Sequence, residues 1–235
     1  MRNIHIPEVR VAYDASGASR AAKRGDIVII VDVIDMSTTL ETCIELGALA
    51  VFGASPKGSK APVKLDPLKI AKTAAKKALI ANTPLVIVSE PRIGKDKDRE
   101  RYCSHILGIL REEGCIVDSI IPNIGKEIAG LISCKNKIVI AVTDSGGTAY
   151  DAAFCEGAKV CTATIARTSQ SKGIEPAKKG TLRALRLSRK YKKNITVVAA
   201  SSNSMEDILA AQYISNLLLL LRKNEMESEE PSWLL

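Results

Sequence analysis

Two carboxylates and three hydroxyls follow the apolar segment that begins at Ile27. They belong to Asp32, Asp35, Ser37, Thr38 and Thr39. Carboxylate oxygens are hard ligands of the kind that Mg²⁺ takes in proteins, and a magnesium ion commonly bridges such ligands to a phosphate. The types and spacing of these residues therefore suggest a site for a phosphate ester and magnesium.

Two later stretches, 143–151 (TDSGGTAYD) and 199–207 (AASSNSMED), repeat this design at the end of an apolar run. In each of the three stretches a hydroxyl precedes an acid by three residues, which is the spacing of a capping box. The pairs are Thr38 with Glu41, Thr148 with Asp151 and Ser204 with Asp207. The three hydroxyls are therefore either helix caps alone or caps that also contact a ligand.

The elements that must position these stretches alternate along the chain. Runs rich in Val, Ile and Ala predict strands at 26–33, 48–53, 84–89, 115–120, 137–143, 159–164 and 195–200. Helical periodicity lies between most of them, at 38–46, 67–81, 99–113, 148–156, 178–192 and 205–222. Continuous apolar strands that alternate with helices are typical of a parallel sheet covered on both faces. We expect an α/β protein, a three-layer α/β/α sandwich with a mostly parallel central sheet.

The chain of 235 residues is long enough for one large core. We therefore expect a single domain at 1–222, followed by a C-terminal tail at 223–235, with two small domains as the alternative. The stretches 55–66 and 91–98 contain Gly, Pro and several Lys residues, which is typical of loops.

The three polar stretches are expected to meet, because loops at the carboxyl ends of parallel strands gather at one edge of the sheet. Helix N-termini at that edge favour an anion such as phosphate, and Gly146 and Gly147 would let the backbone approach it. None of the stretches is a P-loop or a dinucleotide-binding G-x-G-x-x-G motif. We expect Asp32, Asp144 and Ser202 to face one pocket.

Four stretches follow one another over roughly 26–221: DVIDMSTT at 32–39, TDSGGTA at 143–149, ARTSQS at 166–171 and SMED at 204–207. Their order resembles the 2-phosphosulfolactate phosphatase family of coenzyme M biosynthesis. Members of that family carry the motifs D-V-x-R-A-[ST]-T-T, T-T-N-G-T-R-A, N-A-S and S-x-E-D in this order. The resemblance implies an α/β/α fold and magnesium-dependent hydrolysis of a small acidic phosphate monoester.

The resemblance also implies roles for the matching residues. Asp32 and Asp144 would hold Mg²⁺. Asp32 would be catalytic together with Glu206 and Asp207. Glu206 or Asp207 would act as a general acid or base, or would support the metal ligands without binding the ion itself. An alternative for Asp32 is a carboxylate satisfied by neighbouring loop N–H groups. Substrate contacts would come from Asp35, Ser37, Thr38, Thr39, Ser145, Gly146, Gly147, Thr148, Arg167, Ser169, Ser201 and Ser202.

Two positions depart from the family pattern. Asp35 stands where the first motif has an arginine, and Ala149 stands where the second motif has one. Each change removes a charge-assisted contact to an anionic substrate, which Arg167, Arg92 or Lys172 would have to replace. The alternative function is therefore a catalytically inactive family member that binds a small anionic ligand or an acidic partner.

The net charge of +8 is concentrated in the segment 172–193, which holds nine Lys or Arg residues and one Glu. On a helix, five of these residues fall on one stripe: Lys179, Arg183, Arg186, Lys190 and Lys193. Such a stripe is more often a solvated face than a surface for an acidic partner or nucleic acid. An aromatic content of 3% leaves few rings for base stacking, which argues against nucleic acid.

The six cysteines are dispersed and include no C-x-x-C pair, which is typical of reduced thiols in a cytoplasmic protein. We expect no secretion signal, because Glu8, Arg10 and Asp14 interrupt every apolar run near the N-terminus. We also expect no membrane contact, because acidic and amide residues interrupt the apolar segment at 204–221. Assembly into a homo-oligomer is left open.

Overall fold

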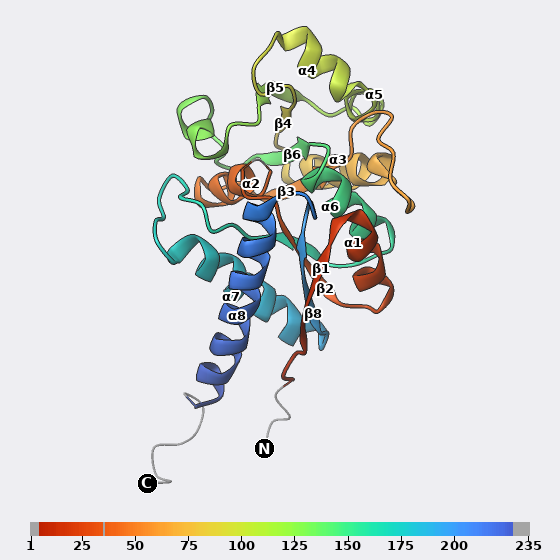
Figure 1. Ribbon diagram of the computed structural model, residues 1–235. Coiled ribbons are helices and arrows are strands. Elements are labelled where there is room, and N and C mark those ends of the chain that lie inside the picture. The colour runs from red at the N-terminus through yellow and green to blue at the C-terminus, as the bar shows by residue number, and fades with distance from the viewer. Residues whose placement is uncertain (1–4, 35, 228–235) are drawn as a thin grey trace.

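The computed structural model describes residues 5–34 and 36–227 (Figure 1). Within this part of the chain, eight strands form two four-stranded sheets in which all neighbouring strands are parallel. Sheet A has the order β1 (Val9–Tyr13), β8 (Ile195–Ala199), β2 (Ile27–Val31), β7 (Val160–Thr162). Sheet B has the order β3 (Ala50–Ala54), β6 (Ile138–Val142), β4 (Leu85–Ser89), β5 (Val117–Pro122). The expected α/β sandwich with parallel strands is confirmed, with the strands divided between two sheets.

The four central strands β2, β8, β4 and β6 are buried along their whole length. Their sequences are nearly continuous Val, Ile, Leu and Ala, because a parallel strand with cover on both faces has no solvated side. In β2, Ile27 and Ile29 join one apolar core whereas Val28 and Ile30 join the other. This alternation follows from the period of two along a strand.

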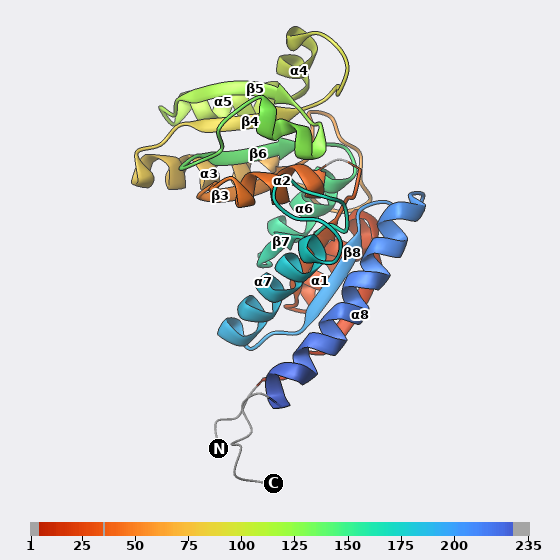
Figure 2. The same cartoon turned by 90° about the vertical axis from the view of Figure 1, so that its left-hand side faces the viewer.

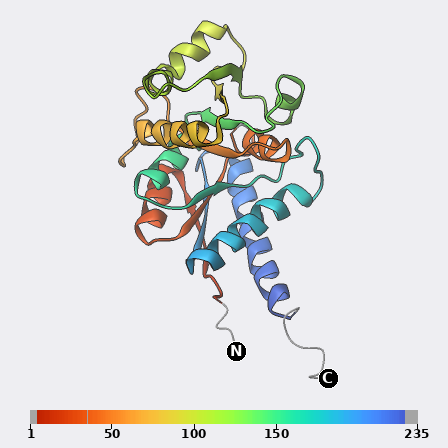
Figure 3. The same cartoon turned by 180° about the vertical axis from the view of Figure 1, so that it is seen from behind.

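Eight α-helices and one 3₁₀-helix cover the sheets of the described residues. They are α1 (Asp14–Lys23), α2 (Met36–Glu45), α3 (Pro67–Ala81), α4 (Asp96–Tyr102), α5 (Ser104–Glu112), η1 (Gly125–Gly130), α6 (Gly146–Cys155), α7 (Glu175–Tyr191) and α8 (Met205–Glu227). Helices α7 and α8 lie side by side on sheet A (Figures 2 and 3). Helix α6 contacts α1, β2 and β3 and so connects the two sheets through one core (Figure 1).

The sequence analysis missed β1 and α1. Strand β1 is an edge strand of mixed composition, VRVAY, whose residues are only partly buried or exposed. Helix α1 consists mainly of small and polar residues and packs through its alanines, so its pattern of apolar residues is weak. Pairing with β8 and packing against α6 stabilise the segment, and neither interaction can be predicted from the local sequence.

Other boundaries also differ from the prediction, most of them by about two residues. The segment 99–113 forms two helices, α4 and α5, and α4 begins inside the predicted loop 91–98. Helix α8 continues to Glu227, past the predicted start of the tail at 223, because helix-forming residues without Gly or Pro extend the pattern. The rest of the predicted tail, 228–235, lies outside the described residues. None of the helices described is both long and apolar enough to cross a bilayer.

Candidate functional site

A cavity of about 670 Å³ opens where the carboxyl ends of the central strands of both sheets come together. Each of β2, β4, β6 and β8 contributes the residues that follow it, and the first turn of α8 and the end of α4 complete the wall. The lining residues are Asp32, Ile34, Glu90, Pro91, Arg92, Tyr102, Thr143, Asp144, Ser145, Ser201, Asn203, Ser204, Glu206 and Asp207. The edge predicted to hold the site is therefore a cavity between two sheets.

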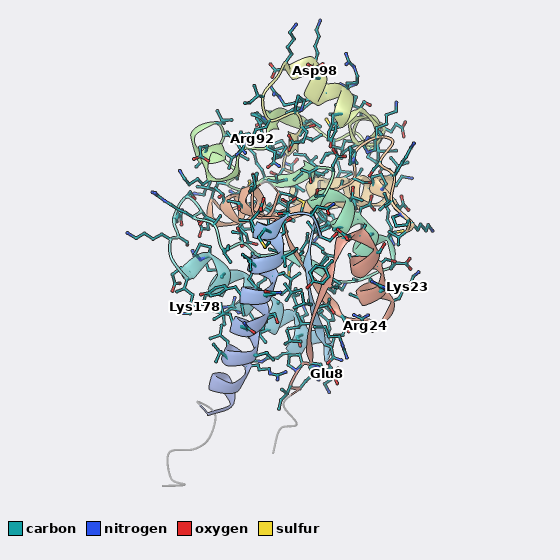
Figure 4. The ribbon with its side chains drawn as sticks, in the orientation of Figure 1. Glu8, Lys23, Arg24, Arg92, Asp98 and Lys178 are labelled. Atoms are coloured by element: carbon teal, nitrogen blue, oxygen red, sulfur yellow. The ribbon has the colours of Figure 1, made fainter. Side chains whose placement is uncertain are left out.

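The wall of this cavity is strongly acidic. The five carboxylates belong to Asp32, Glu90, Asp144, Glu206 and Asp207. Among the described lining residues only Arg92 carries a positive charge, and it lies on the side of sheet B (Figure 4). Lys178 of α7 lies beside sheet A and does not line the cavity. An excess of one sign in a recessed site attracts ions of the other sign. The cavity is therefore suited to a cation, or to an anion that arrives with one.

Asp32 is buried directly after β2, with its side chain against the first turn of α6. A Cβ atom placed on Gly146 would lie 2.2 Å from Asp32 Oδ2, so only glycine leaves room for this carboxylate. Asp144 is exposed and precedes Gly146 by two residues, which places its Cα within about 8 Å of that of Gly146. Asp32 and Asp144 thus line the same wall of the cavity.

Ser37 supports the exit of β2 from the inside and does not line the cavity. It is fully buried, its hydroxyl donates to the Ile30 carbonyl at 2.9 Å, and it accepts the Asp32 N–H at 3.0 Å. The bonds tie the end of the strand to the start of α2. Ser37 therefore positions the Asp32 backbone.

Asp207 joins α8 to the loop after β2. Its carboxylate accepts the Val33 N–H at 2.8 Å, while its own N–H donates to the Ser204 hydroxyl at 3.2 Å. Ser204 is therefore the N-cap of α8 and also a lining residue, one of the two outcomes that the sequence left open. Burial raises the pKa of Asp207, against the lowering effect of the Val33 N–H.

Thr38 and Thr148 are not N-caps, because α2 begins at Met36 and α6 at Gly146. The Thr38 hydroxyl donates to the Val33 carbonyl and shares a hydrogen bond of 2.8 Å with Thr164. Thr148 meets the Ser59 hydroxyl at 3.1 Å. Both threonines are buried and lie outside the wall of the 670 Å³ cavity.

Thr39 reaches the cavity through other side chains. Its hydroxyl donates to Asn123 Oδ1 at 2.6 Å, and Asn123 Nδ2 donates to Glu90 Oε1 at 3.1 Å. Gly125 N–H donates to the same threonine oxygen at 2.8 Å. This buried chain holds the loop after β5 against α2 and orients Glu90.

Ser202 lines a second cavity of about 390 Å³ instead of the first. The two cavities share the wall formed by Asp144, Ser145, Ser201 and Asn203. Ser202 N–H donates to Asp14 Oδ1 at 2.8 Å, which fixes the exit of β8 to α1. The predicted common pocket therefore holds Asp32 and Asp144, with Ser202 on the far side of its rim.

Gly147 lies inside α6 and does not face the cavity. Its N–H donates to Thr143 Oγ1 at 2.7 Å, and a Cβ atom there would lie 2.1 Å from the Ala54 carbonyl oxygen. The glycine thus permits close packing of α6 on the end of β3. Asp35, which stands where the resembled motif has an arginine, lies outside the described residues.

Arg167 and Ser169 are not brought to the cavity. Arg167 is exposed, whereas Ser169 Oγ and Gln170 N–H donate to the Glu45 carboxylate at the end of α2. Ser171 Oγ and Lys179 Nζ donate to the same carboxylate, the latter at 2.8 Å. Burial alone would raise the pKa of Glu45, but these bonds lower it to about 2. The 166–171 segment therefore binds a carboxylate of its own chain.

The Glu45 cluster predicts a loss of stability in acid. A group whose folded pKa is depressed contributes stability above its unfolded pKa, which is near 4.5, and the contribution disappears as the pH falls toward 2. We expect Glu45→Gln to be less stable than the wild type at neutral pH and to approach it between about pH 4.5 and 2. Urea titrations at a series of pH values measure this, and a difference that does not change with pH would contradict it.

Four residues of the predicted basic stripe lie on α7, whereas Lys193 follows the end of the helix, and two of the four are paired within the chain. Lys179 pairs with Glu45, and Arg183 binds both oxygens of Glu41, at 2.6 and 3.0 Å. Thr162 Oγ1 also donates to Glu41. Part of the stripe therefore forms ion pairs that hold α7 against α2, which leaves less unpaired positive charge for an external partner.

Two polar lining residues, Glu90 and Tyr102, were not singled out from the sequence, whereas Arg92 was named as a replacement for a missing arginine. Glu90 and Arg92 follow the predicted strand at 84–89, so the strand-end rule applied to that strand would have placed both at this cavity. The Tyr102 hydroxyl is buried beside the Asp144 carboxylate. Burial, the hydrogen bond with Asp144 and the negative charges of Asp144 and Glu90 raise the pKa of Tyr102, so the hydroxyl keeps its proton. No local pattern indicates this residue.

The described residues contain no group of three or more His, Cys, Asp or Glu side chains arranged to hold a metal ion. A magnesium ion in a phosphate-binding site needs fewer protein ligands than three, because one or two carboxylates, water molecules and the substrate phosphate complete its octahedral coordination. The oxygen donors Asp32 and Asp144 are of the type that this mode uses. Comparison of the chain with known family models, curated proteins and solved structures finds no match.

Proposed function

We propose that the acidic cavity hydrolyses a small phosphate monoester with the help of Mg²⁺. The observation that carries the proposal is the set of five carboxylates, three after central strands and two in the first turn of α8, with Arg92 as the single cationic lining residue described. A phosphate dianion would be repelled by this wall, since like charges a few ångströms apart interact unfavourably by about 1 kcal/mol in water and by more in a recessed site. A divalent cation removes that repulsion.

In this proposal the residues that line the cavity have separate roles. Asp32 and Asp144 hold the cation, which when bound polarises the phosphoryl oxygen. Glu206 and Asp207, in the first turn of α8, flank the same space and are the acid–base residues. Tyr102 offers an O–H donor to a phosphoryl oxygen, and Arg92 offers the remaining positive charge.

The substrate class is a small acidic phosphate ester, with 2-phosphosulfolactate as the nearest known type through the motif resemblance. Arg167 is exposed and absent from the described cavity wall, so it does not replace the missing family arginines there. We therefore expect weaker binding of a triply anionic ester than of an ester with fewer charges.

A second candidate function is binding without hydrolysis. The observation that favours it is the same shortage of arginines on the wall, because phosphoryl transfer relies on positive charge around the transferred group. In this case the cavity would bind a cation together with an anionic ligand and release it unchanged.

A screen of small phosphate esters, with Mg²⁺ and with excess chelator, tests the proposal, together with calorimetric titration of Mg²⁺ alone. We expect phosphate release that requires Mg²⁺. Magnesium binding without release of phosphate from any ester would favour the second candidate. Full activity in excess chelator would exclude the cation from the reaction.

A further inference from the structure

Two cysteines from distant parts of the chain meet in the core beside α2. Cys43 lies in the last turn of α2, and Cys134 lies in the loop between η1 and β6. Their Sγ atoms are 3.2 Å apart and hydrogen-bonded, although the residues are 91 positions apart in the sequence. Both are free thiols in the structure.

Both thiols are buried, but Cys134 belongs to the wall of a recess in the surface. Cys134 lines a cavity of about 450 Å³ together with Leu46, Leu131 and Ser133. Cys43 and Cys134 are both fully buried, and Cys43 does not line the cavity. A small reagent that enters this cavity therefore comes closer to Cys134 than to Cys43, and a small opening of the wall is needed before it meets the sulfur.

The pair is also electrostatically asymmetric. The hydrogen bond with Cys43 lowers the pKa of Cys134 against the effect of burial, and Lys137 lowers it further. The same hydrogen bond raises the pKa of Cys43, and burial adds to this. The thiolate, which is the nucleophile, therefore forms more readily on Cys134, the residue of the pair that lines the cavity.

We propose that Cys43 and Cys134 are a disulfide-forming pair that a hydroperoxide oxidises through the cavity at Cys134. The Cys134 thiolate attacks one oxygen of hydrogen peroxide, which breaks the O–O bond, gives a sulfenic acid and releases hydroxide. The Cys43 sulfur, as its proton leaves, then attacks the Cys134 sulfur and releases the sulfenic oxygen as water. In total two thiols and one peroxide give one disulfide and two waters.

The geometry requires only a small rearrangement. A disulfide has an S–S length near 2.05 Å, so the two sulfurs must approach by about 1.2 Å. The bond would link the end of α2 to the loop before β6. Closing a loop of 91 residues restricts the unfolded chain, so the oxidised protein should have a higher Tm.

The other cysteines provide controls. Cys103 and Cys115 donate to backbone carbonyls, at 3.1 and 3.7 Å. Cys161 is buried, and burial raises its pKa to about 12. A thiol of this kind reacts slowly with peroxide, so Cys161→Ser is the matched control.

The test uses the reduced full-length chain, treated with hydrogen peroxide and then with an alkylating reagent. We expect an intact mass lower by two hydrogens, a Cys43–Cys134 cross-linked peptide, and a rise of several degrees in Tm that reductant reverses. Cys161→Ser should behave like the wild type, whereas Cys134→Ser and Cys43→Ser should each lose the cross-link. Cys43→Ala serves if a serine variant does not fold.

Three results would overturn the proposal. They are oxidation of Cys134 to sulfinic or sulfonic acid without a cross-link, a disulfide that joins other cysteines, and a loss of two hydrogens that persists in the Cys43 variants. Resistance of the wild-type pair to peroxide in the folded protein would overturn it as well.

Discussion

Replacing Asp32 with asparagine is expected to lower kcat/KM for phosphate-ester hydrolysis by on the order of 10²–10³-fold, the cost of removing one preorganised electrostatic contact. Asparagine has the shape of aspartate, so it fits the space beside Gly146 that the Asp32 side chain occupies. The change therefore removes charge with little loss of packing. The affinity for Mg²⁺, measured by calorimetry, should fall together with kcat/KM.

Asp26→Asn is the matched control. Asp26 is also a buried aspartate before a central strand, but it lies at the opposite end of β2, where it accepts hydrogen bonds from Arg24 and Thr196. We expect this variant to lose stability and to keep the wild-type kcat/KM. If Asp32→Asn retains both Mg²⁺ affinity and activity while folded, Asp32 does not hold the cation.

Much of the site could be predicted because one rule applies to it. A carboxylate or hydroxyl directly after a buried parallel strand reaches the carboxyl edge of the sheet, and this holds for Asp32, Asp144 and Ser201. The rule also places Glu206 and Asp207, since α8 begins at that edge. These positions depend only on recognising the strands, which are long apolar runs.

The same residue types failed as predictors once the helix had begun. Ser37, Thr38 and Thr39 look identical in sequence to cavity hydroxyls, but α2 starts at Met36 and each further residue turns the side chain by about 100°. They point into the core, where Asn123, Thr164 and the Ile30 carbonyl are their partners. The starting residue of a helix decides this, and it is the least certain feature of a sequence-based boundary.

Long-range pairing caused the remaining errors. Ser169 matched a family motif, yet its partner is Glu45, 124 residues away. The division of the strands into two sheets also depends on long-range pairing, because the sequences of seven similar apolar runs do not indicate which of them pair. Such choices depend on total packing and not on any local pattern.

Gly147→Ala is expected to lower the free energy of unfolding by about 3 kcal/mol, the upper part of the usual range for overpacking a core. The new methyl group would lie 2.1 Å from the Ala54 carbonyl oxygen and 3.1 Å from Thr143 Oγ1. Backbone cannot rotate out of the way as a flexible side chain can. The start of α6 must therefore move from the end of β3, which also displaces Asp144 and should reduce activity.

Gly108→Ala separates this steric effect from the intrinsic preference of helices for alanine. Gly108 lies inside α5, and a Cβ atom there would meet nothing within 4 Å. Alanine should stabilise that helix by roughly 0.5–1 kcal/mol. Urea unfolding of the two variants and the wild type measures both changes, and we expect them to have opposite signs. If Gly147→Ala is as stable as Gly108→Ala, the first turn of α6 has room to move, and the close packing that holds Asp144 beside Asp32 is not a constraint on the site.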